Sequence, residues 1–503
     1  MSKMYDKLEN LYKSDMVPLH MPGHKRNENS GDMSDYFKLD ITEIDEFDNL
    51  HDEKGIILEA EKRANNIYGA EETHFLVNGS TSGILSAVSA STEKGGEIIA
   101  ARNCHKSFYH AAFLRDLDIH FLSPGKIKAD PSADATILYG EIDPKEVEVN
   151  CKRYPEASSI IITTPTYEGI PSNVAEIARI AHSYGKILIA DEAHGAHFGL
   201  YKDFPQNAIE QGADIVIHSV HKTLPSMTQT ALIHVQGDLV NREKLRRFLH
   251  IYQSSSPSYV LMTSIDSCIN EIREKGNKIF SRVCRYNQKI RRETKQCKHL
   301  FIPDISVIPD PCKILICCKD CSINGQQIYD ILRLEHHIQL EMAGDFYGLA
   351  IITGYDSEEN IDRLIFAINS LDKDLEEGKS HTGNSSENAS SFNRKIIYPD
   401  NNPESCETIS KENETREYPE KVIPFYKAFD SESETIDISS AMGKIAGDFI
   451  NLYPPGIPII LPGERFSKEI IEKISNYINT GRNVQGVEIS ENFERKVKII
   501  RGR

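Results

Sequence analysis

The sequence predicts an α/β protein with a mostly parallel sheet flanked by helices, followed by smaller α+β regions. Short apolar runs at 97–101, 159–164, 186–191 and 213–219 have the length and composition of buried strands. Helical segments separate them, such as the amphipathic stretch 174–185, which ends on a glycine. Buried strands that alternate with helices are typical of parallel sheets, which bind ligands beyond the carboxyl ends of their strands.

The domain organisation follows from composition along the chain. Residues 1–40 are polar and mixed, and we expect an N-terminal arm rather than a core. The range 41–255 holds the predicted sheet and forms the large domain, and 256–378 is predicted to be a small α+β subdomain. Residues 379–420 are rich in Ser, Asn, Glu and Pro, which is typical of a linker or insertion. A C-terminal domain is expected over 421–503.

The charge balance narrows the function classes. The 503 residues carry 58 basic and 75 acidic side chains, a formal net charge of −17. This disfavours a nucleic-acid binder, which normally presents a basic face, and it suits a cationic small-molecule substrate. No apolar run approaches the roughly 20 residues that span a bilayer, and no apolar signal segment follows Met1. We therefore expect a soluble cytoplasmic protein without a membrane partner.

The cysteines predict neither disulfides nor a metal site. Ten cysteines are scattered along a chain without a signal segment, which disfavours a disulfide framework. Cys318 and Cys321 form a CxxC pair with Cys312 and Cys317 nearby, but the second matched pair of a zinc site is missing. The stretch 312–318 (CKILICC) is therefore predicted to be a buried strand with apolar thiols.

The first motif that could carry chemistry is 79–83 (GSTSG), which follows the apolar residues 75–78 and precedes a predicted helix. Small residues allow the backbone to close around an anion, and hydroxyls with free N–H groups at a helix start bind phosphate. An ordinary Ser/Thr helix cap would give the same pattern. The two interpretations are about equally supported by this motif alone.

The second motif places Asp191 at the carboxyl end of the apolar run 186–191. A buried acid needs a partner, and the protonated pyridine nitrogen of pyridoxal phosphate (PLP) is a suitable one. The sequence D-E-A-H also occurs in helicases, but no GxxxxGK[ST] motif is present. His194 and His197 could bind a metal, but the HExxH order is absent.

The third motif places Lys222 directly after the strand predicted at 213–219. A lysine beside His221, at the end of a strand near Asp191, suits a Schiff base, because burial near another cation favours the neutral amine. A solvated surface lysine is the common alternative. The order of phosphate loop, acid and lysine disfavours it, and the 31 positions from Asp191 to Lys222 accommodate one helix and one strand.

Together these motifs resemble the Orn/Lys/Arg decarboxylase family, the fold-type-I, aminotransferase-like PLP decarboxylases of bacteria. The similar segments are PLHMPGHKRN (18–27), DITEIDEFDNLHD (40–52), FLVNGSTSGI (75–84), ARNCHKSFYHA (101–111), TTPTYEGIPSN (163–173), DEAHGAHFG (191–199), HSVHKTLPSMTQTA (218–231), SSSPSY (254–259) and LYPPGIPIILPGE (452–464). They run through most of the chain in order, and HSVHKTL and YPPGIP are the most specific. Compared with longer relatives, the chain is expected to lack a receiver-like N-terminal wing domain.

The resemblance implies a role for each matched residue. Lys222 would hold PLP and Asp191 would pair with its pyridine nitrogen. His105 would stack on one face of the ring and Ala193 on the other, and His194 would approach the 3′-oxygen. The phosphate group would be bound by Ser80, Thr81, Ser219 and His221. Lys222 or His221 would protonate the substrate carbon after CO₂ leaves.

The resemblance also implies a substrate and an assembly. Lysine, arginine or ornithine would yield cadaverine, agmatine or putrescine, as in polyamine biosynthesis. The family's active site lies between two subunits, so a homodimer or larger homo-oligomer is expected, with 254–259 reaching the partner's cofactor phosphate. Glu464 is the candidate for binding the substrate's distal cation, because a buried charge needs a counter-charge. Capping of the following helix is its structural alternative.

Two other functions remain open from the sequence. Another fold-type-I reaction, such as transamination or β-elimination, would use the same Lys222 and Asp191. A catalytically silent PLP-fold binding protein would share the fold, although the intact Asp191 and Lys222 pair disfavours it.

Overall fold

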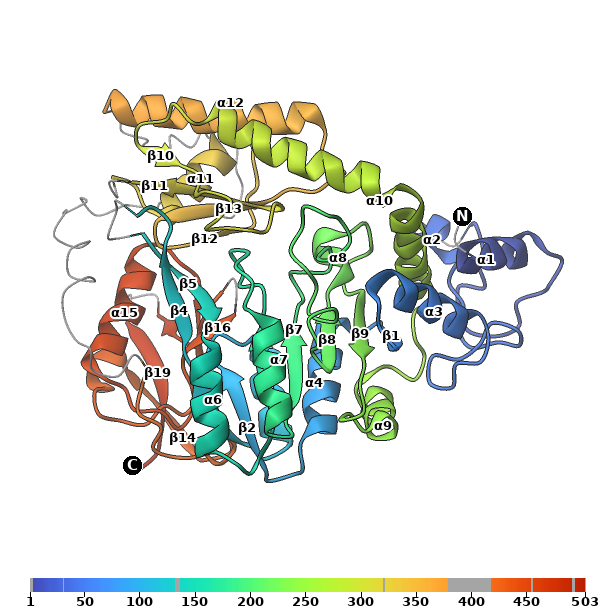
Figure 1. Ribbon diagram of the computed structural model, residues 1–503, viewed down its shortest axis with the longest axis horizontal. Helices are drawn as coiled ribbons and strands as arrows, with labels where there is room; N and C mark the ends of the chain where they lie inside the picture. The colour runs from blue at the N-terminus through green and yellow to red at the C-terminus, as the bar shows by residue number, and fades with distance from the viewer. Residues whose placement is uncertain are drawn as a thin grey trace. The chain divides into compact units, whose positions relative to one another are not determined.

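The computed structural model describes residues 3–29, 31–131, 136–319, 322–378, 418–453, 456–490 and 494–502 (Figure 1). The chain divides into two compact units. The first comprises 1–124, 141–282 and 353–355, and the second comprises 125–140, 283–352 and 356–503. Of the linker expected at 379–420, residues 379–417 lie outside the described residues. Within the described part of the chain, no helix combines the length and apolar character needed to cross a bilayer.

A seven-stranded sheet forms the centre of the first unit, in the order β1-β9-β8-β7-β6-β2-β3. Its strands are β1 (Glu72–Leu76), β2 (Glu97–Ala101), β3 (Asp118–Leu122), β6 (Ala157–Thr163), β7 (Ile187–Asp191), β8 (Ile215–His218) and β9 (Ala231–Val235). The four strands expected from the sequence are confirmed as β2, β6, β7 and β8. All pairings are parallel except those of β9, which runs antiparallel to both β1 and β8. The carboxyl end of β1 therefore lies at the same edge as those of β7 and β8.

The helices of the first unit precede, connect or follow these strands. They are α1 (Lys3–Lys13), α2 (Ser34–Phe37), α3 (Ile56–Tyr68), α4 (Gly79–Ser91), α5 (Lys106–Leu114), α6 (Pro144–Arg153), α7 (Val174–Ser183), α8 (Val220–Thr223) and α9 (Arg242–Tyr252). The helix predicted at 174–185 is confirmed as α7. Gly69 ends α3 in the left-handed conformation, at φ 74°. In α1 the side chains of Met4 and Leu8 are buried, so part of the expected polar arm packs as an amphipathic helix.

Two glycines allow α4 to start directly at the end of β1. Gly79, at φ +75°, turns the chain from the strand into the helix. A Cβ on Gly83 would lie 2.6 Å from Leu76 Cδ1 and 3.3 Å from Ile217 Cγ2. Such a contact with Leu76 is shorter than real Cβ contacts, so a side chain at Gly83 would force Leu76 or the helix to shift. The close packing holds the first turn of α4 at the carboxyl edge of the strands.

The second unit is α+β, as expected for the C-terminal regions. A four-stranded antiparallel sheet has the order β10-β11-β13-β12, and two three-stranded sheets have the orders β14-β19-β18 and β16-β15-β17. Outside the seven-stranded sheet the strands are β4 (Pro124–Lys128), β5 (Ile137–Ile142), β10 (Leu300–Phe301), β11 (Lys313–Cys318), β12 (Met342–Ala343), β13 (Tyr347–Ile351), β14 (Ser433–Asp437), β15 (Ile450–Leu452), β16 (Ile457–Ile460), β17 (Val484–Gln485), β18 (Glu488–Ile489) and β19 (Arg495–Ile500). The remaining helices are α10 (Tyr259–Glu293), α11 (Gly325–Leu334), α12 (Glu358–Glu376), α14 (Phe425–Phe429), α15 (Lys468–Asn479) and the 3₁₀ turn η1 (Ile438–Ser440).

Candidate active site

The three motifs singled out in the sequence meet at the carboxyl edge of the seven-stranded sheet. Asp191 is the last residue of β7, and Lys222 lies in α8, which follows the adjacent parallel strand β8 (Figure 1). The 79–83 loop follows β1 at the same edge. The positive charge of Lys222 acts on the pKa values of both Asp191 and His105, so these side chains are electrostatic neighbours. This edge of the sheet is the candidate active site.

Asp191 is held in a buried position that calls for a cationic partner. Its side chain is only 5% exposed, and Oδ1 accepts a hydrogen bond from the backbone N–H of Ala193 at 3.2 Å. Burial raises the pKa of Asp191, whereas the charge of Lys222 and the Ala193 hydrogen bond oppose this effect. A buried carboxylate is costly without a counter-charge, and a protonated ring nitrogen would supply one.

Lys222 is joined to His194 by a direct contact. Its Nζ lies 3.0 Å from His194 Nε2, and the His194 ring packs on Tyr167 with their centroids 4.2 Å apart. Tyr167 follows β6, the strand beside β7, so three neighbouring loops build this part of the site. The sequence motif around Tyr167 was recognisable, but nothing in it assigned a role to this ring.

His105 is the N-cap of α5 and is held in one orientation. Its Nδ1 accepts the backbone N–H of Ser107 at 3.3 Å and lies 2.8 Å from the Ser107 hydroxyl. Burial lowers the pKa of His105 to about 4, and the positive charge of Lys222 contributes to the decrease. The ring is therefore neutral near pH 7. A neutral, fixed imidazole is well suited to stack on a planar ring.

The α4 N-terminus and the segment before α8 offer unused hydrogen-bonding groups. Asn78 at the N-cap of α4 makes no side-chain capping bond, and the first turn carries Ser80 and Thr81. Ser219 is fully buried, and its hydroxyl oxygen has no hydrogen-bond partner among the described residues. His221 uses Nδ1 to contact the Thr230 carbonyl at 2.8 Å.

This arrangement fits a phosphate group. Uncapped helix N–H groups and hydroxyls are good anion ligands, and a buried hydroxyl without a partner is a cost that a ligand would remove. The simple capping alternative for 79–83 is disfavoured, because no side chain caps α4. The edge thus presents anion ligands on one side and Asp191 on the other, and these residues fit a cofactor with a phosphate and a cationic ring nitrogen.

A buried polar chain that the sequence did not reveal lies beside the site. Glu192 Oε2 lies 2.7 Å from His218 Nε2 and its carboxylate accepts the backbone N–H of Ala208 at 3.1 Å. His218 Nδ1 is 3.1 Å from His234 Nε2, and His234 Nδ1 is 2.7 Å from the Thr73 hydroxyl. This series of hydrogen bonds links β8, β9 and β1 to the residue that follows β7. It fixes the strands from which Asp191 and the segment of Lys222 project.

Glu464 lies in the second unit and has a local partner. Its side chain is 3% exposed, and Oε2 accepts the backbone N–H of Leu461 at 2.7 Å. The N-cap of α15 is Ser467, whose side chain accepts the backbone N–H of Ile470, so Glu464 is not the cap of this helix. The capping alternative is therefore wrong, whereas its substrate role stays a prediction.

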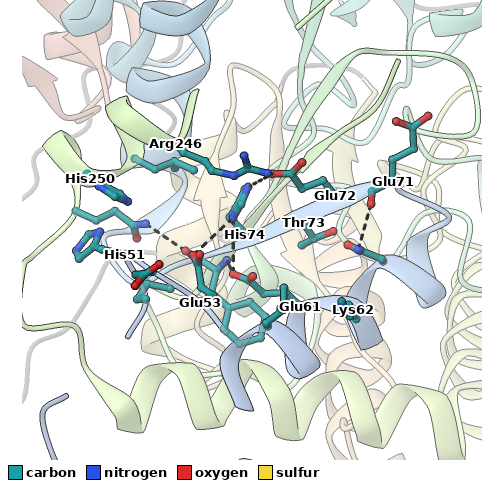
Figure 2. A pocket seen from close by; sticks show the side chains of 17 residues that line it. His51, Glu53, Glu61, Lys62, Glu71, Glu72, Thr73, His74, Arg246 and His250 are labelled. Carbon is teal, nitrogen blue, oxygen red and sulfur yellow. Dashed lines mark hydrogen bonds and ion pairs between the residues drawn. The ribbon is translucent and has the colours of Figure 1, made fainter. Parts of the chain in front are cut away.

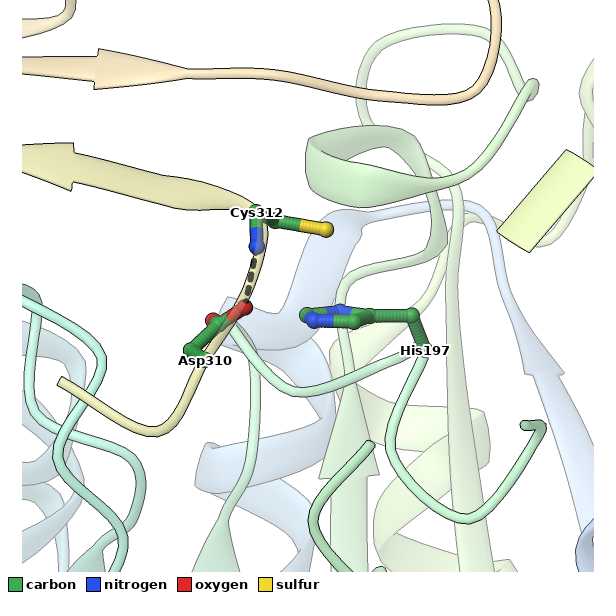
Figure 3. Close-up of side chains that lie close together, drawn as sticks. All are labelled: His197, Asp310 and Cys312. Carbon is green, nitrogen blue, oxygen red and sulfur yellow. Dashed lines mark hydrogen bonds between the residues drawn. The ribbon is translucent and has the colours of Figure 1, made fainter. Parts of the chain in front are cut away.

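The strand predicted at 312–318 is confirmed over most of its length. β11 (Lys313–Cys318) is buried at every position, and burial raises the pKa of the Cys317 thiol. The backbone N–H of Cys312 donates to Asp310 Oδ1 at 2.8 Å, as Figure 3 shows. These cysteines behave as apolar core residues, because burial keeps their thiols protonated. Cys321 of the CxxC pair lies outside the described residues.

Curated proteins align with this chain over most of its length. The arginine decarboxylase of Bacillus anthracis is 28% identical over 95% of this chain and 93% of its own length. The uncharacterized protein YaaO of Bacillus subtilis is 32% identical over 93% of this chain and 92% of its own. The lysine decarboxylase LdcA of Pseudomonas aeruginosa is 23% identical over 88% of this chain and 69% of its own.

Solved structures share the fold. The lysine decarboxylase LdcF of Francisella novicida matches with a TM-score of 0.81 at 19% identity, covering 99% of this chain and 81% of that one. The constitutive lysine decarboxylase of E. coli matches with a TM-score of 0.79 at 17% identity, covering 100% and 82%. The fold is thus that of fold-type-I PLP enzymes, as the sequence predicts.

Family models complete the assignment. The major domain of the Orn/Lys/Arg decarboxylases matches residues 3–353, and their C-terminal domain matches residues 408–488. The first match spans more than half of the chain and includes Asp191, Lys222 and the 79–83 loop. The chain therefore belongs to the Orn/Lys/Arg decarboxylase family and is a decarboxylase.

Proposed function

We propose that the protein uses PLP to decarboxylate a basic L-amino acid, releasing CO₂ and the corresponding amine. The observation that carries this proposal is the convergence of Lys222, Asp191 and an uncapped helix start at one edge of the sheet. Membership of the decarboxylase family selects decarboxylation among the reactions that such a site can perform. Product analysis with the three basic amino acids tests the proposal.

We propose the following roles for the residues at this edge of the sheet. Bound PLP would supply an electron sink for the pair of electrons left on the substrate when CO₂ departs. The Lys222 amine would hold the cofactor covalently, and Asp191 would keep a proton on the pyridine nitrogen. His105 and Ala193 would pack on the two ring faces, and His194 would orient the lysine amine through its 3.0 Å contact.

We propose that a residue at the same edge of the sheet delivers the proton to the substrate carbon. Lys222 Nζ is the first candidate, because release of its covalent link places a free amine beside the reacting carbon. His221 is the second candidate, because its Nδ1 contact with the Thr230 carbonyl fixes the ring. Burial lowers the pKa of His221 and favours the neutral ring, which makes it the weaker proton donor of the two. The phosphate would be held by Ser80, Thr81, Ser219 and His221.

Arginine is the first substrate to test, with lysine and ornithine beside it. The curated relatives that match over more than nine-tenths of this chain include several named arginine decarboxylases. The net charge of −17 favours the approach of any of these cations. The proposed product is therefore agmatine, or cadaverine or putrescine if lysine or ornithine is the substrate.

Glu464→Gln is expected to raise KM for the basic substrate sharply while leaving the cofactor absorbance unchanged. The proposed reason is that the substrate's distal cation needs a buried counter-charge, which the glutamine removes. Glutamine preserves the acceptor for the Leu461 N–H, so the local fold is retained. Steady-state kinetics measure the effect, with the exposed Glu469→Gln as control. If KM and kcat stay at their wild-type values, Glu464 does not bind the substrate and only makes its hydrogen bond with the Leu461 N–H.

The active species is expected to be at least a homodimer. Ser254, Ser255 and Ser256 are exposed in the single chain, as a segment that contacts a partner's cofactor phosphate would be. Tyr259 anchors the end of this segment, because its buried hydroxyl donates to the carbonyl of Asp48 at 2.7 Å. Light scattering at assay concentration measures the assembly. A fully active monomer would refute this expectation.

A further inference from the structure

The first unit also contains a polar cavity. It has a volume of about 450 Å³ and is enclosed by the segment before α3, by α3 itself, by β1 and by α9 (Figure 2). None of the active-site residues predicted from the sequence lines it. Glu53, Glu61 and His74 converge on one side of the cavity, from the three elements named first.

The three side chains have a spacing that could accommodate a cation between them. His74 Nδ1 lies 3.8 Å from Glu53 Oε1 and 4.0 Å from Glu61 Oε1, and the three ligand atoms all lie within 4.8 Å of one another. These separations exceed hydrogen-bond length. A tetrahedral ion with ligand bonds of about 2.1 Å holds its ligand atoms about 3.4 Å apart. The two His74 separations, 3.8 and 4.0 Å, exceed that value by about 0.4 and 0.6 Å.

The other nitrogen of His74 fixes the ring for this task. Nε2 lies 2.7 Å from Glu72 Oε1, and Arg246 contacts the same oxygen at 2.6 Å. Nε2 pairs with Glu72. Burial opposes a charged ring, but the carboxylates of Glu53, Glu72 and Glu61 raise the pKa of His74 to about 10, so Nδ1 carries a proton as well. Metal-binding histidines commonly have such a carboxylate behind them. The Nδ1 proton forms ion pairs with Glu53 at 3.8 Å and Glu61 at 4.0 Å, and a bound divalent ion would take the place of this proton.

Glu61 is a buried acid whose charged neighbour is His74. Its side chain is 2% exposed, and the backbone N–H of Phe75 donates to Oε1 at 2.9 Å. This is its only hydrogen bond within the described part of the chain. A divalent cation between Glu61, Glu53 and His74 would offset the cost of burying the charge.

We propose that Glu53, Glu61 and His74 bind a divalent transition-metal ion such as Zn²⁺ or Mn²⁺. One imidazole nitrogen and two carboxylate oxygens suit ions of this class better than Mg²⁺ or Ca²⁺, which prefer oxygen ligands alone. The ion would tie the segment before α3 to α3 and β1. From the same cavity, the Gln253 side chain accepts the backbone N–H of Val77 at 2.9 Å, just before the 79–83 loop. The ion would therefore act structurally, on the strand that leads into the 79–83 loop.

Calorimetric titration of the chelator-treated, dialysed protein with Zn²⁺ and with Mn²⁺ tests the site. The wild-type protein should bind one ion with saturable affinity, and its Tm should rise with metal concentration. Co²⁺ should give visible absorption bands typical of mixed nitrogen and oxygen ligands. No saturable binding of any of the three ions would overturn the proposal.

Matched variants locate the ion. Glu53→Gln should bind at least tenfold more weakly, and this half-buried position is expected to tolerate the change. Glu61→Gln should have the same effect while keeping the acceptor for the Phe75 N–H. Glu71→Gln is the control, because Glu71 lines the same cavity but pairs with Arg242. Wild-type affinity in Glu53→Gln and Glu61→Gln, or equal losses in Glu71→Gln, would contradict the assignment.

Discussion

Lys222→Ala is expected to abolish decarboxylation and the visible absorbance of the bound cofactor while the protein remains folded. The alanine removes the amine that we propose to hold the cofactor covalently, which lies 3.0 Å from His194 Nε2. It also removes the first candidate for proton delivery. The side chain projects from a short helix after β8, so its loss leaves the sheet pairings intact. Absorbance spectra, circular dichroism and CO₂ release measure the outcome.

The control for this variant is Lys94→Ala. Lys94 is an exposed lysine that pairs with Asp116 at 3.3 Å and lies in a loop away from the strand ends that carry the site. It should behave as the wild type in all three measurements. Substantial decarboxylation by Lys222→Ala would remove this lysine from the proposed role.

Asp191→Asn is expected to keep the cofactor bound and to lower kcat by roughly 10²–10⁴-fold, the range for a group that controls a proton at a reacting centre. The amide oxygen can still accept the Ala193 N–H, so the geometry is preserved. The charge that holds a proton on the ring nitrogen is lost, and the electron sink is weakened. Single-turnover kinetics with measured cofactor occupancy separate the two effects.

The exposed Asp203→Asn serves as the matched control and should leave kcat unchanged. A wild-type rate for Asp191→Asn at full cofactor occupancy would show that this carboxylate does not sustain the electron sink. Loss of cofactor binding instead would assign Asp191 to affinity rather than to rate.

Local sequence patterns predicted the parallel core and the main site residues for a physical reason. Buried parallel strands are short apolar runs, and a polar residue at the end of such a run stands out, as Asp191 does after 186–190. Lys222 was identifiable in the same way, because it follows the predicted strand 213–219, which contains β8. The order of strands in the sheet then brings the two ends together, which the alternation of strands and helices made predictable.

Features that depend on pairing between distant segments could not be predicted. The chain from Glu192 through His218 and His234 to Thr73 depends on the antiparallel placement of β9 between β1 and β8. No spacing in the sequence encodes that register. The amphipathic helix α1 was missed as well, because two buried residues, Met4 and Leu8, give a weak periodic signal in a polar segment.

The cluster of Glu53, Glu61 and His74 illustrates the same limit. Its members lie in a loop, a helix and a strand, and their spacing matches no metal-binding motif. Glu464 differs, because the sequence offered two roles and the structure excludes capping by assigning the α15 cap to Ser467.

Product analysis tests the central claim most directly. The purified protein with added PLP is incubated separately with carboxyl-labelled arginine, lysine and ornithine, and both labelled CO₂ and the organic product are quantified. We predict equimolar CO₂ and amine from at least one of the three amino acids, and arginine is the first candidate. We predict that no keto acid forms. Formation of a keto acid without CO₂, or no product from any of the three with PLP bound, would contradict the assignment of a basic-amino-acid decarboxylase.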